Sequence, residues 1–210
     1  ISIKSIMAAY LKCLRYVKDE ANPFSIRRWI EDETNLEWLF FSSLEKKHEA
    51  LKPLITARLD IAISELLSLE GNSERRIWII LDELTSLHKI PTLYKILSKG
   101  RKPGACVVIG IQNYAQLGDV YGNNGAKIIS SLLNTRLMFR QPDPDMAAWS
   151  ARNLGETVID EVREGISYGA NTMRDGVSIN RQEIKKAVVS PSEMMRLADL
   201  HCYVRLAGHY

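Results

Sequence analysis

Apolar positions at the start of the chain recur at steps of three and four residues. They are Ile3, Ile6, Met7, Tyr10, Leu11, Leu14 and Val17. This spacing predicts a helix with one apolar face. The pair Asn22-Pro23 ends the pattern, because the residue before a proline is pushed out of the helical region. We therefore expect a domain boundary near residue 22.

Beyond that boundary, short apolar runs alternate with helical patterns. The runs predict strands at 38–41, 77–81, 105–111, 137–139 and 202–206, and the patterns between them predict helices at 47–69, 91–101, 123–133 and 144–154. Continuously apolar runs such as IWIIL indicate strands covered on both faces, and the strand–helix alternation indicates parallel crossovers. The sequence thus predicts an α/β fold, with a mostly parallel sheet flanked by helices.

The alternation stops between about residues 156 and 186. Glycines punctuate a polar stretch there, GISYGANTMRDGVSINR, which is typical of a hairpin or loop that leaves the core. Its basic and acidic residues balance. Two interpretations stay open: a solvated excursion, or a loop that contacts DNA or a partner through Arg174 and Arg181.

Composition narrows the class of protein. Of 210 residues, 46% are hydrophobic and 25% charged, as in an ordinary globular protein, which excludes a disordered tail, a collagen-like fibre and a small disulfide scaffold. The net charge of +3 neither requires nor excludes a nucleic-acid partner, so any DNA contact must come from local patches. Cys13, Cys106 and Cys202 lie far apart without CxxC spacing, which favours free thiols in a reducing compartment.

The chain carries no evident membrane or targeting segment. Its most apolar long stretch, 54–69, is interrupted by Arg58, Asp60 and Glu65, which makes a bilayer crossing too costly. The sequence begins with Ile1 and without a signal peptide. We therefore expect a piece of a longer protein, with any membrane anchor outside this segment.

Two carboxylates follow the predicted strand 77–81. Asp82 and Glu83 would stand at the carboxyl end of a strand, where open α/β sheets bind ligands. A nucleoside triphosphatase needs such a pair: Asp82 can hold Mg²⁺ through its waters, and Glu83 can orient or deprotonate the water that attacks the γ-phosphate. The alternative is a strand that simply ends in solvated acidic residues.

Two further polar residues fit the same chemistry. Gln112 ends the next predicted strand, so its amide could sense the γ-phosphate beside the acidic pair; otherwise it only begins a loop. Arg101 follows the helix between the two strands, where it could reach phosphates bound to a neighbouring subunit as an arginine finger. A cationic helix end, favoured by the helix dipole, is the alternative for Arg101.

The loop that cradles phosphates is absent from the sequence. No GxxxxGK[ST] occurs in the 210 residues, although nucleotide hydrolysis with such an acidic pair needs it. We expect the loop upstream of residue 1, separated from this segment by an inserted domain. The isolated segment should then not hydrolyse ATP efficiently.

The combined motifs resemble the motor domain of conjugative type IV secretion coupling proteins, nearest the TraD-type ATPases of F-like plasmids. The likeness is carried by LDELTSLHKIPTLYKILSKGRKPGACVVIGIQNYAQLGDVYG (81–122), LLNTR (132–136), SYGANTMRDGVS (167–178), VVSPSEMMRLADLHCYVRLAG (188–208), PFSIRRWI (23–30) and WLFFSS (38–43). It thus covers nearly the whole chain.

This resemblance implies a RecA-like P-loop NTPase core interrupted by an all-α domain. Residues 1–22 would be the final helix of that insertion, and 23–210 the C-terminal part of the motor domain. Asp82 and Glu83 fall on the family's Walker B acids, with Asp82 and Gln112 at the nucleotide, Asp82 at Mg²⁺ and Arg101 acting in trans.

The family's activity supplies the expected function and partners. Members are hexameric motors at the cytoplasmic face of the bacterial inner membrane, and they use ATP to drive DNA with its relaxase into a secretion channel. The alternatives are a related ring DNA translocase with another cargo, and a non-catalytic docking module for DNA or relaxosome proteins.

Overall fold

The computed structural model describes residues 3–167 and 176–208, and of residues 5, 6, 9, 160–167 and 176–182 it describes only the backbone. By their contacts the residues divide into two compact units, 1–133 and 134–210.

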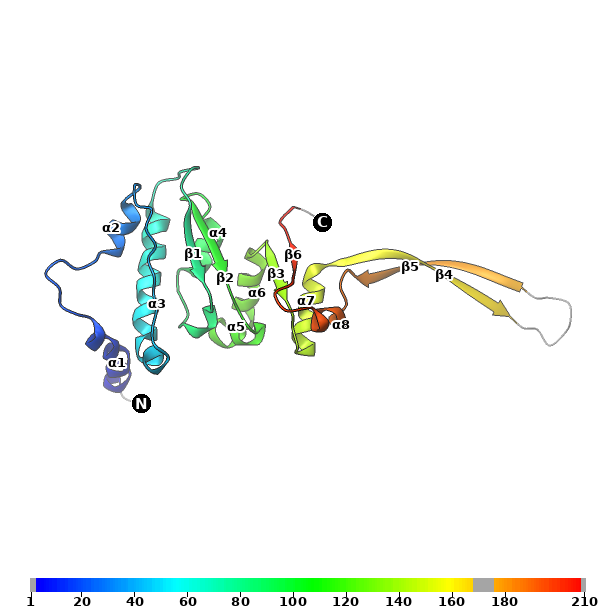
Figure 1. Ribbon diagram of the computed structural model, residues 1–210, viewed down its shortest axis with the longest axis horizontal. Helices are drawn as coiled ribbons and strands as arrows, with labels where there is room; N and C mark the ends of the chain where they lie inside the picture. The colour runs from blue at the N-terminus through cyan, green and yellow to red at the C-terminus, as the bar shows by residue number, and fades with distance from the viewer. Residues whose placement is uncertain (1–2, 168–175, 209–210) are drawn as a thin grey trace. The chain divides into compact units, whose positions relative to one another are not determined.

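The first unit combines helices with one pair of strands (Figure 1). Its elements are α1 (Ile3–Leu11), the 3-10 turn η1 (Lys12–Tyr16), α2 (Ile26–Glu31), α3 (Glu45–Ser68), β1 (Ile77–Leu81), the 3-10 turn η2 (Leu84–Ser86), α4 (Leu93–Lys99), β2 (Ala105–Ile109), α5 (Tyr114–Tyr121) and α6 (Asn123–Leu132). Strands β1 and β2 pair in parallel, from Ile77 opposite Ala105 to Leu81 opposite Ile109. The chain passes between them through α4, so both strands end at the same edge of the sheet.

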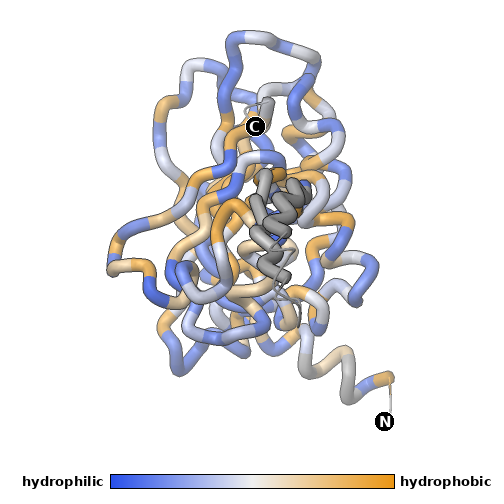
Figure 2. Tube along the Cα trace, turned by 90° about the vertical axis from the view of Figure 1, so that its right-hand side faces the viewer, coloured by the Kyte–Doolittle hydropathy of each residue, from blue (hydrophilic) through white to orange (hydrophobic). Residues whose placement is uncertain are grey.

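The core of this unit lies between the strand pair and the helices. Ile63 and Leu66 of α3, Leu93 of α4 and Ile129 of α6 are fully buried. One face of β1 contributes Ile77 and Ile79 to this core. Figure 2 shows hydrophilic and hydrophobic stretches alternating along the trace, with both kinds at the periphery, in agreement with the exposed hydrophobic residues such as Leu36 and Phe40.

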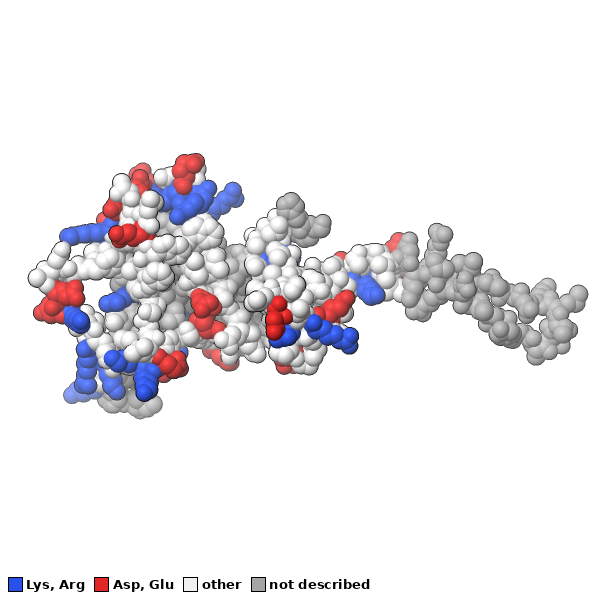
Figure 3. Space-filling model, in the orientation of Figure 1, with Lys and Arg blue, Asp and Glu red and all other residues white. Residues whose placement is uncertain are grey.

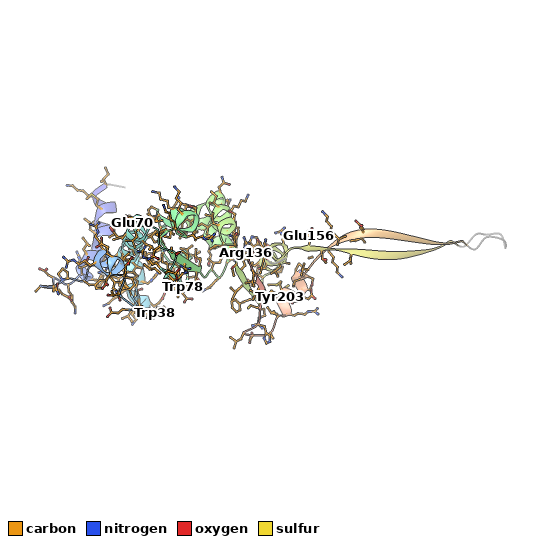
Figure 4. The ribbon with its side chains drawn as sticks, turned by 90° about the horizontal axis from the view of Figure 1, so that it is seen from above. Trp38, Glu70, Trp78, Arg136, Glu156 and Tyr203 are labelled. Carbon is orange, nitrogen blue, oxygen red and sulfur yellow. The ribbon has the colours of Figure 1, made fainter. Side chains whose placement is uncertain are left out.

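The other face of the strand pair is open within the described residues. Trp78 and Ile80 on β1 are 60% and 54% exposed, and Val108, which pairs with Ile80, is 44% exposed. Figure 4 labels Trp78 at this position. The expectation that the run 77–81 is covered on both faces is therefore wrong for the described part of the chain, because its helices cover one face only.

The second unit contains two antiparallel strand pairs and two short helices. Its elements are β3 (Arg136–Phe139), α7 (Pro144–Leu154), β4 (Glu156–Ser167), β5 (Gly176–Ala187), α8 (Pro191–Arg196) and β6 (Cys202–Arg205). Strand β3 pairs with β6, so that Arg136 lies opposite Arg205 and Met138 opposite Tyr203; Arg136 and Tyr203 are labelled in Figure 4. Strands β4 and β5 form a long hairpin that begins at Glu156.

Capping side chains fix the helices of this unit. Asp143 accepts a hydrogen bond from the Met146 N–H at the start of α7, and Ser190 forms a capping box with Glu193 at the start of α8. Each cap satisfies N–H groups that have no partner within the helix. The two helices pack with β3 around Met138, Ala147, Ala151, Val189 and Met194.

The α/β class is confirmed, and so are four of the five predicted strands and the helices predicted at 47–69, 91–101, 123–133 and 144–154. The first predicted helix, over residues 3–17, is α-helical only as far as Leu11 and continues as the 3-10 turn η1 to Tyr16. The hairpin interpretation of 156–186 is also confirmed over β4 and β5. Among the described strands only β1 and β2 pair in parallel, whereas β3 with β6 and β4 with β5 form antiparallel pairs, so the pairing is not mostly parallel as predicted. The predicted strand 38–41 is wrong: this segment has no strand partner in the described residues, and Trp38 and Phe40 stack on each other, largely exposed.

No helix in the described ranges is long and apolar enough to cross a membrane. The longest, α3, contains Glu, Lys, Arg and Asp along its 24 residues.

Candidate functional site

The acidic pair stands where β1 ends, and Gly110 fixes the backbone at that point. The Gly110 N–H donates to the carbonyl oxygen of Leu81 at 2.7 Å, and the Gly110 carbonyl accepts from the Leu84 N–H at 3.1 Å. A Cβ atom at position 110 would lie 2.0 Å from the carbonyl oxygen of Asp82, so only glycine fits there without a backbone shift. The end of β2 therefore holds Asp82 and Glu83 in place from the neighbouring strand.

A pocket of about 380 Å³ opens at this edge of the sheet. It is lined by Glu83, Thr85, Ser86, Gln112, Gln116, Asp119 and Val120. The structure thus brings together Glu83 and Gln112, which the sequence places at the ends of neighbouring strands. Asp82 is exposed and is not among the residues that line the pocket.

Hydrogen bonds within the turn η2 hold Glu83 in position. Its carbonyl oxygen accepts from the Ser86 N–H at 3.2 Å and from the Ser86 hydroxyl at 2.8 Å. Its carboxylate accepts from the Thr85 hydroxyl. Sequence reasoning missed Thr85, Ser86, Gln116 and Asp119; the only available signal was a pair of hydroxyl residues closely following the acids.

His48 of α3 stabilises the same turn, and both its ring nitrogens form hydrogen bonds. Its Nε2 lies 3.0 Å from the carbonyl oxygen of Ser86, and its Nδ1 lies 2.9 Å from the hydroxyl of Ser43. A carbonyl oxygen only accepts, so Nε2 carries the proton, and in the neutral ring Nδ1 accepts from Ser43. The extended segment before α3 is thereby tied to a residue that lines the pocket.

Further along α3, two polar side chains hold the loop between η2 and α4. The Thr56 hydroxyl accepts from the His88 N–H at 3.2 Å, and Asp60 accepts from the Thr92 N–H and hydroxyl at 3.0 and 2.6 Å. Burial, assisted by nearby Lys52 and opposed by Glu49, lowers the pKa of His88. The neutral imidazole is therefore favoured in the folded protein.

The loop is also tied to α5. The Tyr121 hydroxyl accepts from the Ile90 N–H at 3.2 Å, and burial raises the pKa of Tyr121. Together, α3 and α5 hold both sides of the loop that follows Glu83.

Arg101 does not join this pocket. It lies at the opposite end of the strand pair, where β2 begins, and lines a separate groove of about 930 Å³. Four exposed cations share this groove: Arg76, Lys99, Arg101 and Lys102. None of the four forms a salt bridge with a carboxylate of the described chain. Figure 3 shows Lys and Arg side chains gathered over this end of β1 and α4.

The two arginines predicted to contact DNA cannot be placed. Arg174 lies outside the described residues, and of Arg181 the structure describes only the backbone, opposite Val162 in the hairpin.

The donor set at the pocket suits a magnesium ion bound together with phosphate. No group of three or more His, Cys, Asp or Glu residues that could enclose a metal occurs within residues 3–167 and 176–208. Mg²⁺ needs no such cage, because it is usually held by one or two carboxylates, several waters and the substrate's phosphate oxygens. Within the pocket, Glu83 offers carboxylate oxygens of that kind and Gln112 offers an amide; the exposed carboxylate of Asp82 lies next to Glu83 in the chain, outside the pocket lining.

Comparison with known proteins gives a consistent result. The family described as "Type IV secretion-system coupling protein DNA-binding domain" matches residues 1–210. Coupling protein TraD of Escherichia coli (strain K12) is 43% identical over 217 aligned positions, which span the whole of this chain and 30% of that protein.

Solved structures of the conjugative coupling protein TrwB have a similar fold. The unbound monoclinic form is 36% identical with a TM-score of 0.76, and the alignment covers 88% of this chain and 41% of that one. The complex with ADP and Mg²⁺ is 35% identical with a TM-score of 0.72, over 88% of this chain and 40% of that one. The chain therefore spans less than half the length of these relatives.

Proposed function

Because the chain belongs to the type IV secretion-system coupling proteins, we propose that it is part of an ATP-driven DNA translocase. The full protein would deliver relaxase-bound DNA to a type IV secretion channel during bacterial conjugation.

The observation that carries this proposal is the pocket shared by Glu83 and Gln112 at the carboxyl end of β1 and β2. Glu83 orients the attacking water and accepts its proton, and Gln112 contacts the γ-phosphate. Asp82 holds Mg²⁺ through its waters. The bound ion neutralises charge on the phosphates. A TrwB complex with ADP and Mg²⁺ supports the choice of ligand.

Arg101 completes the site from a second copy of the chain. It lies at the other end of the strand pair from Glu83, so we propose that it acts on nucleotide bound to a neighbouring subunit of a hexamer. A cation supplied in trans stabilises the charge that develops in phosphoryl transfer. ATP would then bind between subunits.

For the domain organisation of the full protein, we propose the arrangement that the family implies. We propose that residues 1–22 end an all-α insertion and that 23–210 are the C-terminal part of a RecA-like motor domain. The phosphate-binding loop and the membrane anchor would lie elsewhere in the full protein, at the cytoplasmic face of the inner membrane. The segment alone would then not hydrolyse ATP efficiently.

The test is ATP hydrolysis by a soluble form of the full-length protein, with and without single-stranded DNA, beside its Glu83→Gln variant. We expect turnover that DNA stimulates and the substitution abolishes. Verified oligomers without turnover, despite an intact phosphate loop, would instead favour the non-catalytic docking module. Stimulation by DNA without transfer of a relaxase would favour another ring translocase.

DNA contact by Arg174 and Arg181 stays a sequence prediction with its own test. Replacing both with Ala should weaken DNA binding and flatten its dependence on salt, because each phosphate contact releases counterions. Replacing Arg196, an exposed arginine of α8, provides a matched control. An unchanged salt dependence would contradict the assignment.

A further inference from the structure

We propose that Thr85 is a positioning residue that orients the carboxylate of Glu83 for attack by water. This inference rests on the proposed hydrolysis of ATP at the pocket, and it adds a residue that acts through Glu83.

The main chain of Glu83 is already fixed, so only its side chain is left to orient. Gly110 bonds to the residues on either side of the acidic pair, and Ser86 binds the Glu83 carbonyl through its N–H and its hydroxyl. The side chain of Glu83 still has three rotatable bonds. Its direction into the pocket therefore depends on what the carboxylate contacts.

Thr85 provides that contact. In the described chain it is the only residue hydrogen-bonded to the Glu83 carboxylate, through its hydroxyl. A hydrogen bond to an ionised carboxylate is roughly twice as strong as one between neutral groups. Thr85 is only partly exposed and lines the same pocket, so the contact is partly shielded from competing water.

Gln116 of α5, the helix that follows β2 along the chain, lies beside this contact. Its side-chain oxygen lies 3.4 Å from the Thr85 hydroxyl, which has one proton and gives it to Glu83. Amide oxygen and nitrogen are assigned from the hydrogen-bond network, and the nitrogen placed here would donate to Thr85. A chain then runs from Gln116 through Thr85 to Glu83.

Thr85 should therefore affect the rate of hydrolysis more than the binding of nucleotide. The Thr85→Val substitution keeps the shape of the side chain and removes the hydroxyl. We expect kcat to fall about tenfold, as for one lost hydrogen bond in a site, with KM and nucleotide affinity unchanged. Thr85→Ser keeps the hydroxyl and should retain most of the rate.

The experiment measures DNA-stimulated ATP hydrolysis and nucleotide binding in the full-length oligomer for Thr85→Val, Thr85→Ser and Glu83→Gln. Thr157→Val, at an exposed position of β4, is the matched control and should behave as the unsubstituted protein. Gln116→Leu interrupts the same chain without changing the turn, and we expect a loss of about two- to threefold in kcat.

Two results would overturn the inference while leaving the proposed function intact. One is an unchanged or raised kcat in a stably folded Thr85→Val protein that still depends on Glu83. The other is a Thr85→Ser protein as slow as Thr85→Val, which would indicate a packing role for the methyl group. Absence of any Glu83-dependent hydrolysis would overturn the proposed function, and this inference with it.

Discussion

The two ends of the β1–β2 pair differ in charge and in how their side chains are held. At the carboxyl end, Glu83 is fixed by Ser86 and Thr85 in a pocket of about 380 Å³. At the amino end, Arg101 lies exposed in a groove of larger volume, about 930 Å³. A fixed carboxylate suits a base that acts on ligand bound beside it, whereas an exposed cation suits contact with a second molecule.

Opposite charge at opposite ends favours a head-to-tail contact between copies. Such a contact is heterologous, and it closes into a ring when the rotation between subunits allows it. The proposed trans role of Arg101 needs this arrangement.

Removing the cation at the amino end should have the largest effect. We expect Arg101→Ala to reduce kcat on the order of 10³-fold, as arginine fingers do in phosphoryl transfer. Steady-state hydrolysis in the assembled full-length protein measures it. Arg76→Ala, at another exposed arginine of the same groove, is the matched control and should lose far less. Equal losses would indicate a general charge effect and no specific role for Arg101.

Replacing Glu83, the proposed general base at the carboxyl end, should have the second-largest effect on kcat. Glu83→Gln should lower kcat by about 10²-fold or more, since general bases contribute this much, while nucleotide binding persists. A fluorescent nucleotide titration beside the hydrolysis assay separates the two. Asp119→Asn, at an exposed acid that lines the same pocket, is the matched control. Hydrolysis at the normal rate in Glu83→Gln would contradict the role of Glu83.

A substitution at Gly110, whose backbone hydrogen bonds connect the ends of the two strands, tests whether this contact shapes the pocket. Gly110→Ala would put a Cβ atom 2.0 Å from the Asp82 carbonyl oxygen, so the backbone must move. We expect the free energy of unfolding to fall by about 1–3 kcal/mol, as in other overpacked sites, and hydrolysis to fall with it. Thermal and urea unfolding measure the first effect.

Gly118→Ala provides the comparison for that substitution. There the nearest atom is the movable side-chain oxygen of Asn123, at 3.1 Å, and Ala favours a helix over Gly by up to about 1 kcal/mol. Its stability should be unchanged or slightly higher. Equal destabilisation by both substitutions would show that the contact at Gly110 is not the cause.

Lowering the pH should destabilise the folded protein at the loop that follows Glu83. We expect this effect to be the smallest of the series. Burial lowers the pKa of His88, so the unfolded chain binds a proton more readily than the folded one. Stability should therefore fall as pH drops below about 6.5, the ordinary value for histidine. Melting temperatures at pH 7.5 and 5.5 measure it, and His88→Gln should reduce the difference. Exposed His201→Gln is the control, and an equal pH response in all three proteins would contradict the role of His88.

The sequence predicts the elements around the pocket well because their signals are local. The run IWIIL matches β1 residue for residue, and the run that begins at Ala105 starts β2. Asp82, Glu83 and Gln112 follow these runs, so the shared edge could be expected from parallel pairing alone. Here a short-range pattern was enough to predict that Glu83 and Gln112 lie at the same edge of the sheet.

The errors concern features that depend on distant partners. The segment 38–41 is as apolar as a strand, yet a strand also needs a neighbour to pair with, and the described chain offers none. The antiparallel pairing of β3 with β6 depends on how α7, the hairpin and α8 return the chain. Thr85 was not predicted because its proposed role depends on the direction of its hydroxyl. The turn η2 sets that direction, and the sequence pattern does not reveal it.

In the proposed motor, the two ends of the strand pair work together across copies of the chain. Glu83→Gln and Arg101→Ala proteins, each strongly impaired alone, should be mixed under conditions that allow subunits to exchange, and ATP hydrolysis should be measured over the mixing ratio. In a mixed ring, an intact Glu83 on one subunit can meet an intact Arg101 on the next. We predict that activity returns and peaks near equal amounts; a mixture that stays as inactive as its components, despite verified exchange, would contradict the account.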